Sequence, residues 1–364
     1  MTKRIFISGG GTGGHIYPAV AIYEELLKFI PNEDIFYIGS PRNLEKSIFS
    51  KYPVKFLNVY TEGMPRKLSL KFIFWSLELI YSTILSLFYI LKYRPSAIIG
   101  TGGYVSAPIL IAGIILKVPC FIHDSDAFPG VVSRKLAPFC QCVFVAFENA
   151  QNRLKAPKIL LNGNPLRNFE INKPKTQILK ELGLKENKKT ILAIGGSQGA
   201  KTINEALCNC AEDIIKEFDC QIIHQTGKKK FSQIPTHLKE LEGYLVAPYF
   251  DNMPEIYQIA DLVISRAGSI SISEINNCGL PAILIPYPHA ASNHQYFNAK
   301  AIQEKGAAII LEDKNCNSDS LKKLIENLLK NEQKLQEMAQ NSHNLMKKNA
   351  SSNLVKEVLN FIKF

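Results

Sequence analysis

Residues 262–299 combine a strand, a turn, a helix start and a polar loop in an order that suits binding of a phosphorylated sugar. An apolar run at 262–264 enters the turn 265–268, and the following helix begins with Ser, Ile and Glu rather than with bulky hydrophobic residues. The unpaired N–H groups and the positive dipole end of such a helix start stabilise a phosphate. Glu274, one to two turns into this helix, can accept hydrogen bonds from a sugar diol.

A second apolar run, 281–286, ends in the polar loop 288–295, whose side chains are able to bind hydroxyl groups. Together these segments predict a pocket for a nucleotide-sugar. The alternative is an ordinary strand–helix–strand unit with a Ser-rich helix cap, and the Ser and Gly positions alone do not separate the two interpretations.

The segment 9–14, Gly-Gly-Gly-Thr-Gly-Gly, follows a buried-strand pattern at 3–8 and precedes a helix predicted over 17–29. It satisfies the dinucleotide fingerprint G-x-G-x-x-G, which also requires an acidic residue at the end of the second strand. That strand ends in Ile-Gly-Ser-Pro-Arg42, which disfavours NAD and leaves NADP formally open. A second glycine turn, 195–199, has no role in a dehydrogenase but suits a transferase that handles diphosphates in two domains.

Strand and helix patterns alternate along both halves of the chain, which predicts two doubly wound α/β domains with parallel sheets. The expected strands are 3–8, 35–38, 97–100, 120–123 and 143–146 in the first half, and 190–194, 221–225, 244–247, 262–264, 282–286 and 308–311 in the second. A Gly-Asn-Pro turn at 163–165 breaks the alternation. We therefore expect domains at 1–163 and 164–347, facing each other across a cleft, with final helices at 318–347 and 352–364.

The 364 residues carry a formal net charge of +11 and are 46% hydrophobic, which allows two buried cores and indicates an anionic partner. Nothing resembles a zinc finger or an aromatic RNA-binding strand, so no nucleic-acid partner is expected. The eight cysteines are scattered without zinc spacing, which indicates buried thiols in a reducing cytosol. The N-terminal apolar run is too short for a signal peptide, and we expect a cytosolic or peripheral protein.

Residues 72–91 form an apolar run long enough to span a bilayer, which needs about 20 residues. A transmembrane span is disfavoured because the run lies between strands of one predicted sheet; a buried core helix is the main alternative. We predict a helix lying on an anionic membrane, where each nearby basic residue contributes on the order of 1 kcal/mol. The residues expected to reach the membrane are Phe72, Trp75, Phe88, Lys71 and Lys92.

Six segments of the chain resemble the MurG family of bacterial transferases: SGGGTGGHIYPA, GTGGYVSAP, GGSQGA, RAGSISISE, GLPAILIPYPHA and NHQYFNA. Members of this family move N-acetylglucosamine from UDP onto lipid I. The resemblance spans nearly the whole chain. It implies two Rossmann-like domains of the GT-B fold, inverting transfer to the 4-hydroxyl of the N-acetylmuramoyl unit, and peptidoglycan synthesis at the cytoplasmic side of the cell membrane. It also implies that a last helix, about 348–364, packs back on the first domain.

The same resemblance supplies a set of binding residues for UDP-N-acetylglucosamine and the acceptor. The implied donor-binding residues are Thr12, Gly13, Gly14, Asp126, Arg167, Ser197, Gln198, Phe250, Arg266, Gly268, Ser269, Ile270, Ser271, Glu274, His294 and Gln295. The implied acceptor and diphosphate residues are Gly10, Gly11, Gly102, Gly103 and Tyr104. Phe250 and Ile270 would pack around the uracil, Glu274 would bind the ribose, and His294 and Gln295 would recognise the sugar, with the pairing of His294 left open.

Displacement of UDP by a sugar hydroxyl requires a base, stabilisation of the leaving diphosphate and contacts that bind the nucleoside. His15, directly after the first glycine turn, is the leading base and matches the family's histidine; a helix-capping role is the alternative. Asp124 is the rival base or the group that orients it. Better-known members have Glu and Asn where this chain has Asp124 and Asp126, which leaves the division of roles open.

Asp124-Ser125-Asp126 also matches the short D-x-D motif that holds a divalent ion in a different transferase fold. Helix starts and the cation Arg167 can stabilise the diphosphate without a metal, so we expect no obligatory metal or cofactor, with a divalent cation at most stimulatory. Three other functions stay open: a UDP-sugar:diacylglycerol glycosyltransferase, a UDP-N-acetylglucosamine 2-epimerase and a non-catalytic sugar-nucleotide sensor.

Overall fold

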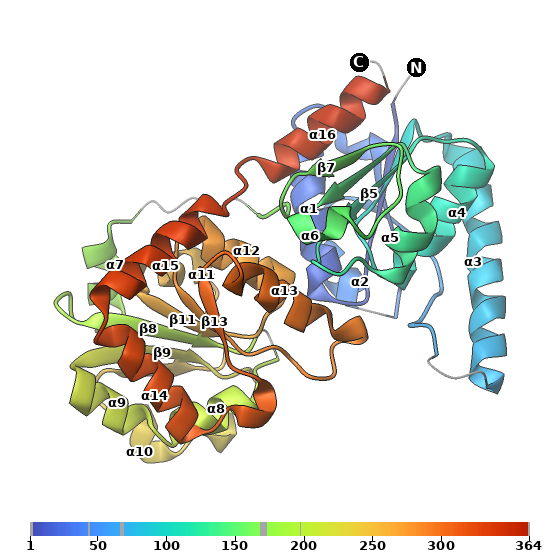
Figure 1. Cartoon of the computed structure of the whole chain (residues 1–364). Coiled ribbons are helices and arrows are strands. Elements are labelled where there is room, and N and C mark those ends of the chain that lie inside the picture. Colours follow the sequence, from blue (N-terminus) through green and yellow to red (C-terminus); the bar gives the residue numbers. More distant parts are fainter. Residues whose placement is uncertain (1–2, 43, 66–68, 168–172, 197, 363–364) are drawn as a thin grey trace. The chain divides into compact units, whose positions relative to one another are not determined.

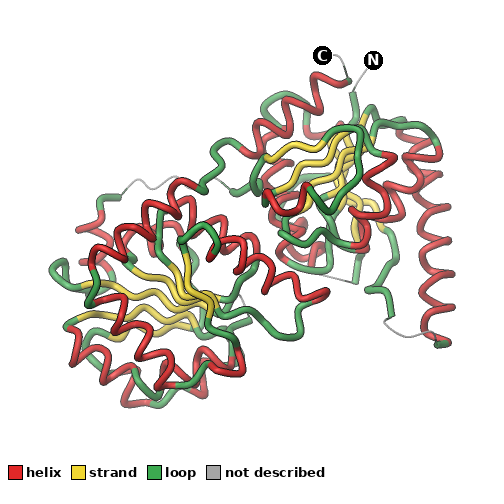
Figure 2. Tube along the Cα trace, viewed as in Figure 1, coloured by secondary structure: helices red, strands yellow, loops and turns green. Residues whose placement is uncertain are grey.

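A computed structural model describes residues 3–42, 44–65, 69–167, 173–196 and 198–362 (Figure 1). The chain divides into two compact units, one formed by residues 1–168 with 347–364 and the other by residues 169–346. The sequence suggested a boundary slightly earlier, after Gly163. Each unit is a parallel sheet between layers of helices, as the traces of strands and helices show (Figure 2).

The first unit contains a seven-stranded parallel sheet in the order β3-β2-β1-β4-β5-β6-β7. Its strands are β1 (Ile5–Ser8), β2 (Ile35–Gly39), β3 (Lys55–Asn58), β4 (Ala97–Gly100), β5 (Cys120–Asp124), β6 (Cys142–Val145) and β7 (Ile159–Leu161). Its helices are α1 (Gly13–Leu26), α2 (Leu44–Phe49), α3 (Leu70–Tyr93), α4 (Ala107–Ile115), α5 (Val131–Leu136), α6 (Glu148–Gln151) and α16 (Ala350–Phe361).

Successive residues of the central strand β1 enter different cores, since side chains alternate across a strand. Ile5 and Ile7 pack with α1 and α16, whereas Phe6 packs with residues of α4 on the opposite face. Both faces are therefore buried, which explains the continuous apolar runs of the central strands. The last helix, α16, is tied to this unit by a hydrogen bond from Asn162 Nδ2 to the carbonyl of Ala350 (2.9 Å).

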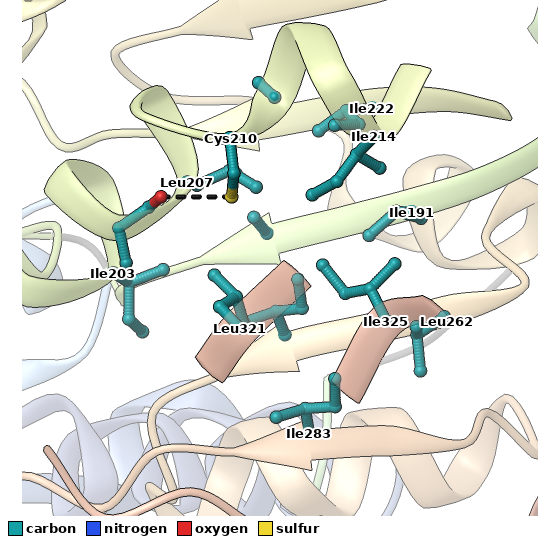
Figure 3. Packing of buried hydrophobic residues seen from close by; sticks show 14 of the residues in the cluster. Ile191, Ile203, Leu207, Cys210, Ile214, Ile222, Leu262, Ile283, Leu321 and Ile325 are labelled. Atoms are coloured by element: carbon teal, nitrogen blue, oxygen red, sulfur yellow. Dashed lines mark hydrogen bonds between the residues drawn. The ribbon is translucent and has the colours of Figure 1, made fainter. Parts of the chain in front are cut away.

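The second unit contains a six-stranded parallel sheet in the order β10-β9-β8-β11-β12-β13. Its strands are β8 (Lys189–Ile194), β9 (Cys220–Gln225), β10 (Tyr244–Ala247), β11 (Leu262–Ser265), β12 (Ala282–Leu284) and β13 (Ala308–Ile310). Its helices are α7 (Lys175–Glu181), α8 (Lys201–Cys208), α9 (Ala211–Phe218), α10 (Thr236–Lys239), α11 (Met253–Ile259), α12 (Ser269–Asn277), α13 (His294–Gln303), α14 (Ser318–Leu329) and α15 (Glu332–Asn344). One face of its sheet packs against α8, α9 and α14 (Figure 3).

Three sequence predictions differ from the structure in ways that have physical causes. Strands β3 and β7 were not predicted, because both lie at sheet edges and are only partly buried, which weakens their apolar pattern. The helix predicted over 318–347 is two helices, since Asn331 caps a new helix by accepting a hydrogen bond from the N–H of Lys334 (2.9 Å). The first helix begins at Gly13, four residues before its predicted start.

Both sheets reverse their strand order at one place, between β1 and β4 in the first unit and between β8 and β11 in the second. Doubly wound sheets bind ligands at the carboxyl ends of the strands on either side of such a switch point. The two glycine turns follow β1 and β8, so each unit places one of them at its switch point.

Candidate functional site

In the first unit, the loops after β1 and β4 are joined by hydrogen bonds at the switch point. The N–H of Gly10 donates to the carbonyl of Gly102 (3.3 Å), and that of Thr101 donates to Ser8 (2.8 Å). The Thr101 hydroxyl also donates to the backbone carbonyl of His15 (2.7 Å). These bonds bring together the predicted glycine residues of both loops and hold the first turn of α1 against them.

His15 is half-buried in that first turn, with its ring fixed through Nδ1. This nitrogen lies 3.1 Å from the carbonyl oxygen of Gly10 and 3.3 Å from the Thr12 hydroxyl. A carbonyl only accepts hydrogen bonds, so Nδ1 carries the proton of the neutral ring and the lone pair is on Nε2. Among the described residues Nε2 has no hydrogen-bond partner, which leaves it able to accept a proton from a ligand.

Gly102 and Gly103 are required where the two loops meet. Their φ angles are +100° and +76°, a region that costs other residues about 1–2 kcal/mol. A Cβ on Gly102 would lie 2.7 Å from Cδ2 of His15, and one on Gly103 would lie 2.2 Å from the carbonyl oxygen of Gly10. Tyr104, which begins a short 3₁₀ helix directly after them, is half-buried.

Glu45 on α2 supports the same loop and was not identified from the sequence. Its carboxylate is fully buried and accepts hydrogen bonds from the N–H groups of Ser40 (3.1 Å) and Gly11 (3.4 Å). Both of these partners are backbone groups, so no pattern of residue types predicts the contacts. Because the N–H groups of Gly10 and Gly11 are occupied inside the protein, the anion-binding capacity of this loop is shifted to the first turn of α1.

That first turn keeps the features of an anion site at Gly13 and Gly14. Thr12 is the N-cap residue but makes no capping hydrogen bond through its side chain, and no acidic residue lies in the turn. The positive end of the α1 dipole is therefore not compensated there by a side chain of its own first turn.

Asp124, the rival base, is buried at the end of β5 and has both carboxylate oxygens engaged. Oδ1 accepts the N–H of Asp126 (3.2 Å) and Oδ2 accepts that of Gly130 (3.0 Å). Burial, with the nearby charge of Asp126, raises the pKa of Asp124, while a hydrogen bond with Ser133 opposes the rise. These contacts make Asp124 the residue that holds the β5–α5 loop; the half-buried Asp126 lies in that loop.

Two further predicted or neighbouring residues of this unit, His123 and the cation Arg167, differ in burial. His123 is fully buried, and burial lowers its pKa to about 4, so the ring is neutral near pH 7. Its Nε2 lies 3.3 Å from the carbonyl oxygen of Gly163. The exposed Arg167 stacks over the ring of Tyr17 on α1, with 4.6 Å between its Cζ atom and the ring centroid.

In the second unit, the glycine turn after β8 and the start of α12 both lie at the switch point. Ile194 and Ser265, the last residues of β8 and β11, are paired in the parallel register. The α12 helix starts at Ser269 after the N-cap Gly268, without a capping side chain and without an acidic residue in its first turn. Ile270 and Ser271, also in this turn, are half-buried. This helix start has the features of an anion site.

The glycine turn itself is pressed against the loop after β9. A Cβ on Gly199, which has a φ of +68°, would lie 1.7 Å from the carbonyl oxygen of Thr226. Gln198 is exposed in this turn, and the predicted site residue Ser197 lies outside the described residues. Lys230 supports the turn by donating to the carbonyl of Gln198 (2.7 Å).

Gln225 links the glycine turn to Phe250 and was not identified from the sequence. Its side-chain oxygen accepts the N–H of Phe250 (3.0 Å), and its amide nitrogen lies 3.5 Å from the carbonyl oxygen of Gly196. Since Gln225 is buried, it fixes the backbone of the half-buried Phe250 relative to the turn.

Glu274 projects from the second turn of α12 and is oriented by a buried tyrosine on α11. The hydroxyl of Tyr257, which is 1% exposed, donates to Oε2 of Glu274 (3.2 Å). Burial raises the pKa of Tyr257 well above its ordinary value, so the hydroxyl remains a donor. The structure thus fixes one oxygen of the carboxylate predicted to bind a diol.

His294 and Gln295 begin α13, and each is fastened to the preceding loop. His294 Nδ1 donates to the carbonyl of Ala291 (2.7 Å), which leaves the Nε2 lone pair for another donor. Gln295 Oε1 accepts the N–H of Tyr287 (2.9 Å). Arg266, predicted to bind the donor, forms an ion pair within its own unit (2.5 Å between Nη1 and Asp313 Oδ1).

The apolar face of α3 points away from its unit. Exposed hydrophobic residues recur every three or four positions, as a single helix face requires. They are Leu70, Ile73, Phe74, Leu77, Ile80, Tyr81, Ile84, Phe88 and Leu91. The buried side instead presents Ser82, Ser86 and Ile90. This is the reverse of a core helix, so the alternative of a buried core helix was wrong.

The predicted membrane residues are distributed over both sides of this helix. Phe88 is 54% exposed, but Phe72 and Trp75 are half-buried, and Trp75 Nε1 donates to the carbonyl of Glu62 (3.0 Å). Lys71 and Lys92 are exposed near its two ends. By length and composition α3 could cross a membrane, and only 17% of its most apolar stretch is buried inside the protein. The helix nevertheless packs on α4 within its own unit.

Glu78, the acid inside the apolar run, is paired with Arg42 at 3.2 Å. The Arg42 guanidinium also lies 5.5 Å from the ring centroid of Tyr60. Because Arg42 is occupied in this way, it gives no support to an NADP site.

No group of three or more His, Cys, Asp or Glu side chains that could hold a metal ion occurs among the residues that the structure describes.

Comparison with known proteins gives matches over nearly the whole chain. The model of the glycosyltransferase family 28 N-terminal domain matches residues 5–145, and that of the family 28 C-terminal domain matches residues 190–358.

Two curated relatives share one name, UDP-N-acetylglucosamine–N-acetylmuramyl-(pentapeptide) pyrophosphoryl-undecaprenol N-acetylglucosamine transferase. The relative from Halothermothrix orenii is 39% identical, with 97% of each chain covered. The relative from Bacillus subtilis is 34% identical, covering 96% of this chain and 97% of its own. The crystal structure of Acinetobacter baumannii MurG is similar with a TM-score of 0.79 and 25% identity, covering 98% of this chain and 99% of that chain.

Substitution of Gly103 by Ala tests the close approach of the two loops in the first unit. We expect Gly103→Ala to lower the stability of this unit by roughly 2–4 kcal/mol, the sum of the backbone cost and the overlap with Gly10. Amide hydrogen exchange in β1 and β4 measures this loss of stability. Gly11→Ala is the matched control, because Gly11 has a φ of +85° but open space at its Cβ position. Equal losses in the two variants would contradict a role for the contact.

Proposed function

The chain belongs to glycosyltransferase family 28 and transfers N-acetylglucosamine from UDP-N-acetylglucosamine to a lipid-linked N-acetylmuramyl-pentapeptide, and we propose that the 4-hydroxyl of lipid I attacks with inversion at the anomeric carbon. The product is lipid II, so the enzyme acts in peptidoglycan synthesis. This proposal rests on the occurrence in one chain of two features: a histidine whose Nε2 is free, and a helix start that suits a diphosphate.

We assign donor binding to the second unit. The diphosphate lies at the uncapped start of α12, where Gly268 and Ser269 present backbone N–H groups, and the glycine turn after β8 lies beside it in the sheet. Glu274, whose Oε2 accepts a hydrogen bond from Tyr257, binds the ribose diol, and Phe250 packs against the uracil. Helix dipoles and backbone donors stabilise the charge that develops on UDP, so no obligatory metal is required.

We assign the base to the first unit. Nε2 of His15 accepts the proton of the acceptor hydroxyl, because Nδ1 is already protonated and held by the Gly10 carbonyl. The charge of the resulting imidazolium is stabilised by the same carbonyl. Asp124 is a poorer candidate, since both of its oxygens already accept backbone N–H groups. The uncapped first turn of α1 supports an additional site for the diphosphate of the acceptor.

We further propose that the exposed face of α3 docks on the anionic cytoplasmic face of the cell membrane, which makes the enzyme a peripheral membrane protein. The face is apolar along 24 residues, and Lys71 and Lys92 lie near its ends. Its one acidic residue, Glu78, is neutralised by Arg42. Membrane docking would bring the soluble enzyme to its lipid-linked acceptor.

Product analysis tests the function against its alternatives. With a panel of UDP-sugars and lipid I, mass spectrometry should find one N-acetylhexosamine added to the lipid, and only with UDP-N-acetylglucosamine. Sugar release without any acceptor would indicate the epimerase instead. A glycosylated diacylglycerol would indicate the related lipid transferase, and binding without turnover would indicate a sensor.

Removal of the base should slow the chemical step and spare donor binding. We expect His15→Ala to lower kcat by about 10²- to 10⁴-fold, the usual contribution of a positioned base, with little change in UDP affinity by calorimetry. The kcat of Asp124→Asn is measured for comparison. If His15→Ala keeps the full wild-type rate in single-turnover measurements, Asp124 becomes the candidate for the base.

Membrane docking depends on the outward face of α3. We expect the triple change of Phe74, Ile84 and Phe88 to Ser to reduce binding to anionic vesicles at least ten-fold, since a fully buried apolar side chain contributes about 1.5–3 kcal/mol. Turnover of a short-chain soluble acceptor should be unchanged.

The control for this experiment changes Leu27, Phe29 and Phe139 to Ser, because these residues are also exposed and apolar but lie outside α3. Equal loss of vesicle binding in both triple variants would contradict a docking role for α3, as would undiminished binding of the α3 variant.

A further inference from the structure

Arg266 lies directly after β11 and contacts the loops that follow the next two strands of the sheet. Its Nη1 donates to the carbonyl of Ile285 (3.1 Å), which follows β12, and forms the 2.5 Å ion pair with Asp313, which follows β13. The two side chains are 12% and 20% exposed. One guanidinium therefore joins three neighbouring loops at the carboxyl edge of the second sheet.

The loop after β12 is the one that leads to the predicted sugar contacts, and we call residues 285–295 the sugar loop. Arg266 also packs beneath it, with its Cζ atom 5.5 Å from the ring centroid of Tyr287. The N–H of Tyr287 donates to Gln295, which closes the loop on the first turn of α13. Further along that helix, Asn298 is buried and donates to the carbonyl of Ala267, the neighbour of Arg266 (3.2 Å).

The backbone of the sugar loop is not in a conformation that its residues favour locally. Ser292 and Asn293 both have positive φ angles, 51° and 54°, which cost a residue other than glycine of order 1 kcal/mol or more each. Contacts from elsewhere in the fold must maintain such a conformation. Arg266 contacts the beginning of the loop at Ile285, and Asn298, on the helix that follows the loop, is held by the carbonyl of Ala267.

The same contacts argue against Arg266 as the cation that binds the diphosphate. Its charge is compensated by Asp313, and its Nη1 donors are directed to a carboxylate and to backbone carbonyls of its own unit. These contacts all go through Nη1 and hold the guanidinium in position, and freeing it would leave Asp313 without its partner.

We propose that the Arg266–Asp313 ion pair is a positioning device that sets the sugar loop and thereby determines selectivity for N-acetylglucosamine over other UDP-sugars. This inference rests on the proposed function, in which His294 and Gln295 recognise the sugar. Neither member of the pair touches the donor diphosphate. Asp313 is thus a specificity-determining residue that acts through Arg266.

The test compares donor selectivity with nucleotide affinity in Asp313→Asn, Arg266→Lys and Arg266→Gln. The ratio of kcat/KM for UDP-N-acetylglucosamine to that for UDP-glucose or UDP-N-acetylgalactosamine should fall about ten- to a hundred-fold in each, as for a displaced substrate-positioning group. UDP affinity should stay within about two-fold of wild type, and Arg266→Gln combined with Asp313→Asn should lose little more than either change alone.

Glu312→Gln is the matched control, because Glu312 neighbours Asp313 but pairs with the exposed Lys314 (2.8 Å) and should leave the ratio unchanged. A large loss of UDP affinity in both Arg266 variants, with unchanged selectivity in Asp313→Asn, would overturn the proposal and make Arg266 a diphosphate ligand. A wild-type enzyme without preference for UDP-N-acetylglucosamine would contradict the proposed function itself. A wild-type preference that survives all three substitutions would contradict only the role of the pair.

Discussion

The close approach of the loops after β1 and β4 is the constraint on which the proposed reactive centre of the first unit depends. The carbonyl of Gly10 fixes the tautomer of His15, and Gly103 must lack a side chain for that carbonyl to be where it is. Parallel pairing of β1 and β4 brings both loops to one edge of the sheet. The histidine that we propose as the base therefore owes its position to strand order and two absent Cβ atoms, and no carboxylate among the described residues forms a hydrogen bond with its ring.

Three acidic side chains hold loops at the carboxyl edges of the two sheets. Glu45 holds the first glycine loop, Asp124 holds the loop after β5, and Asp313 holds Arg266 beneath the sugar loop. In the first two cases the carboxylate accepts backbone N–H groups, which are strong bonds when buried. Reactive groups placed on loops need such supports, because a loop alone does not fix a side chain within the tolerance of catalysis.

Helix α3 reverses the usual distribution of polar and apolar residues. Its serines face the unit, where Ser82 donates to the carbonyl of Tyr60 (2.6 Å), and its large apolar residues face outward. Ser82 also accepts the N–H of Tyr60 (2.9 Å), and Ile90 packs into the core of the unit, so the helix is attached through its inner side. The exposed apolar side is the surface that we propose for membrane docking, and Glu78, the one acidic residue of the helix, is paired with Arg42.

The sequence alone determined the two parallel sheets, their glycine turns and the position of His15, because central strands and helix starts are encoded in local periodicity and turn residues. It did not identify the edge strands β3 and β7, whose partial burial gives a weak pattern. Only the tertiary structure decided the partners of Glu45, Gln225 and Arg266 and the outward face of α3. These depend on contacts between residues distant in the chain, often with backbone groups, and such contacts leave no spacing in the sequence that would predict them.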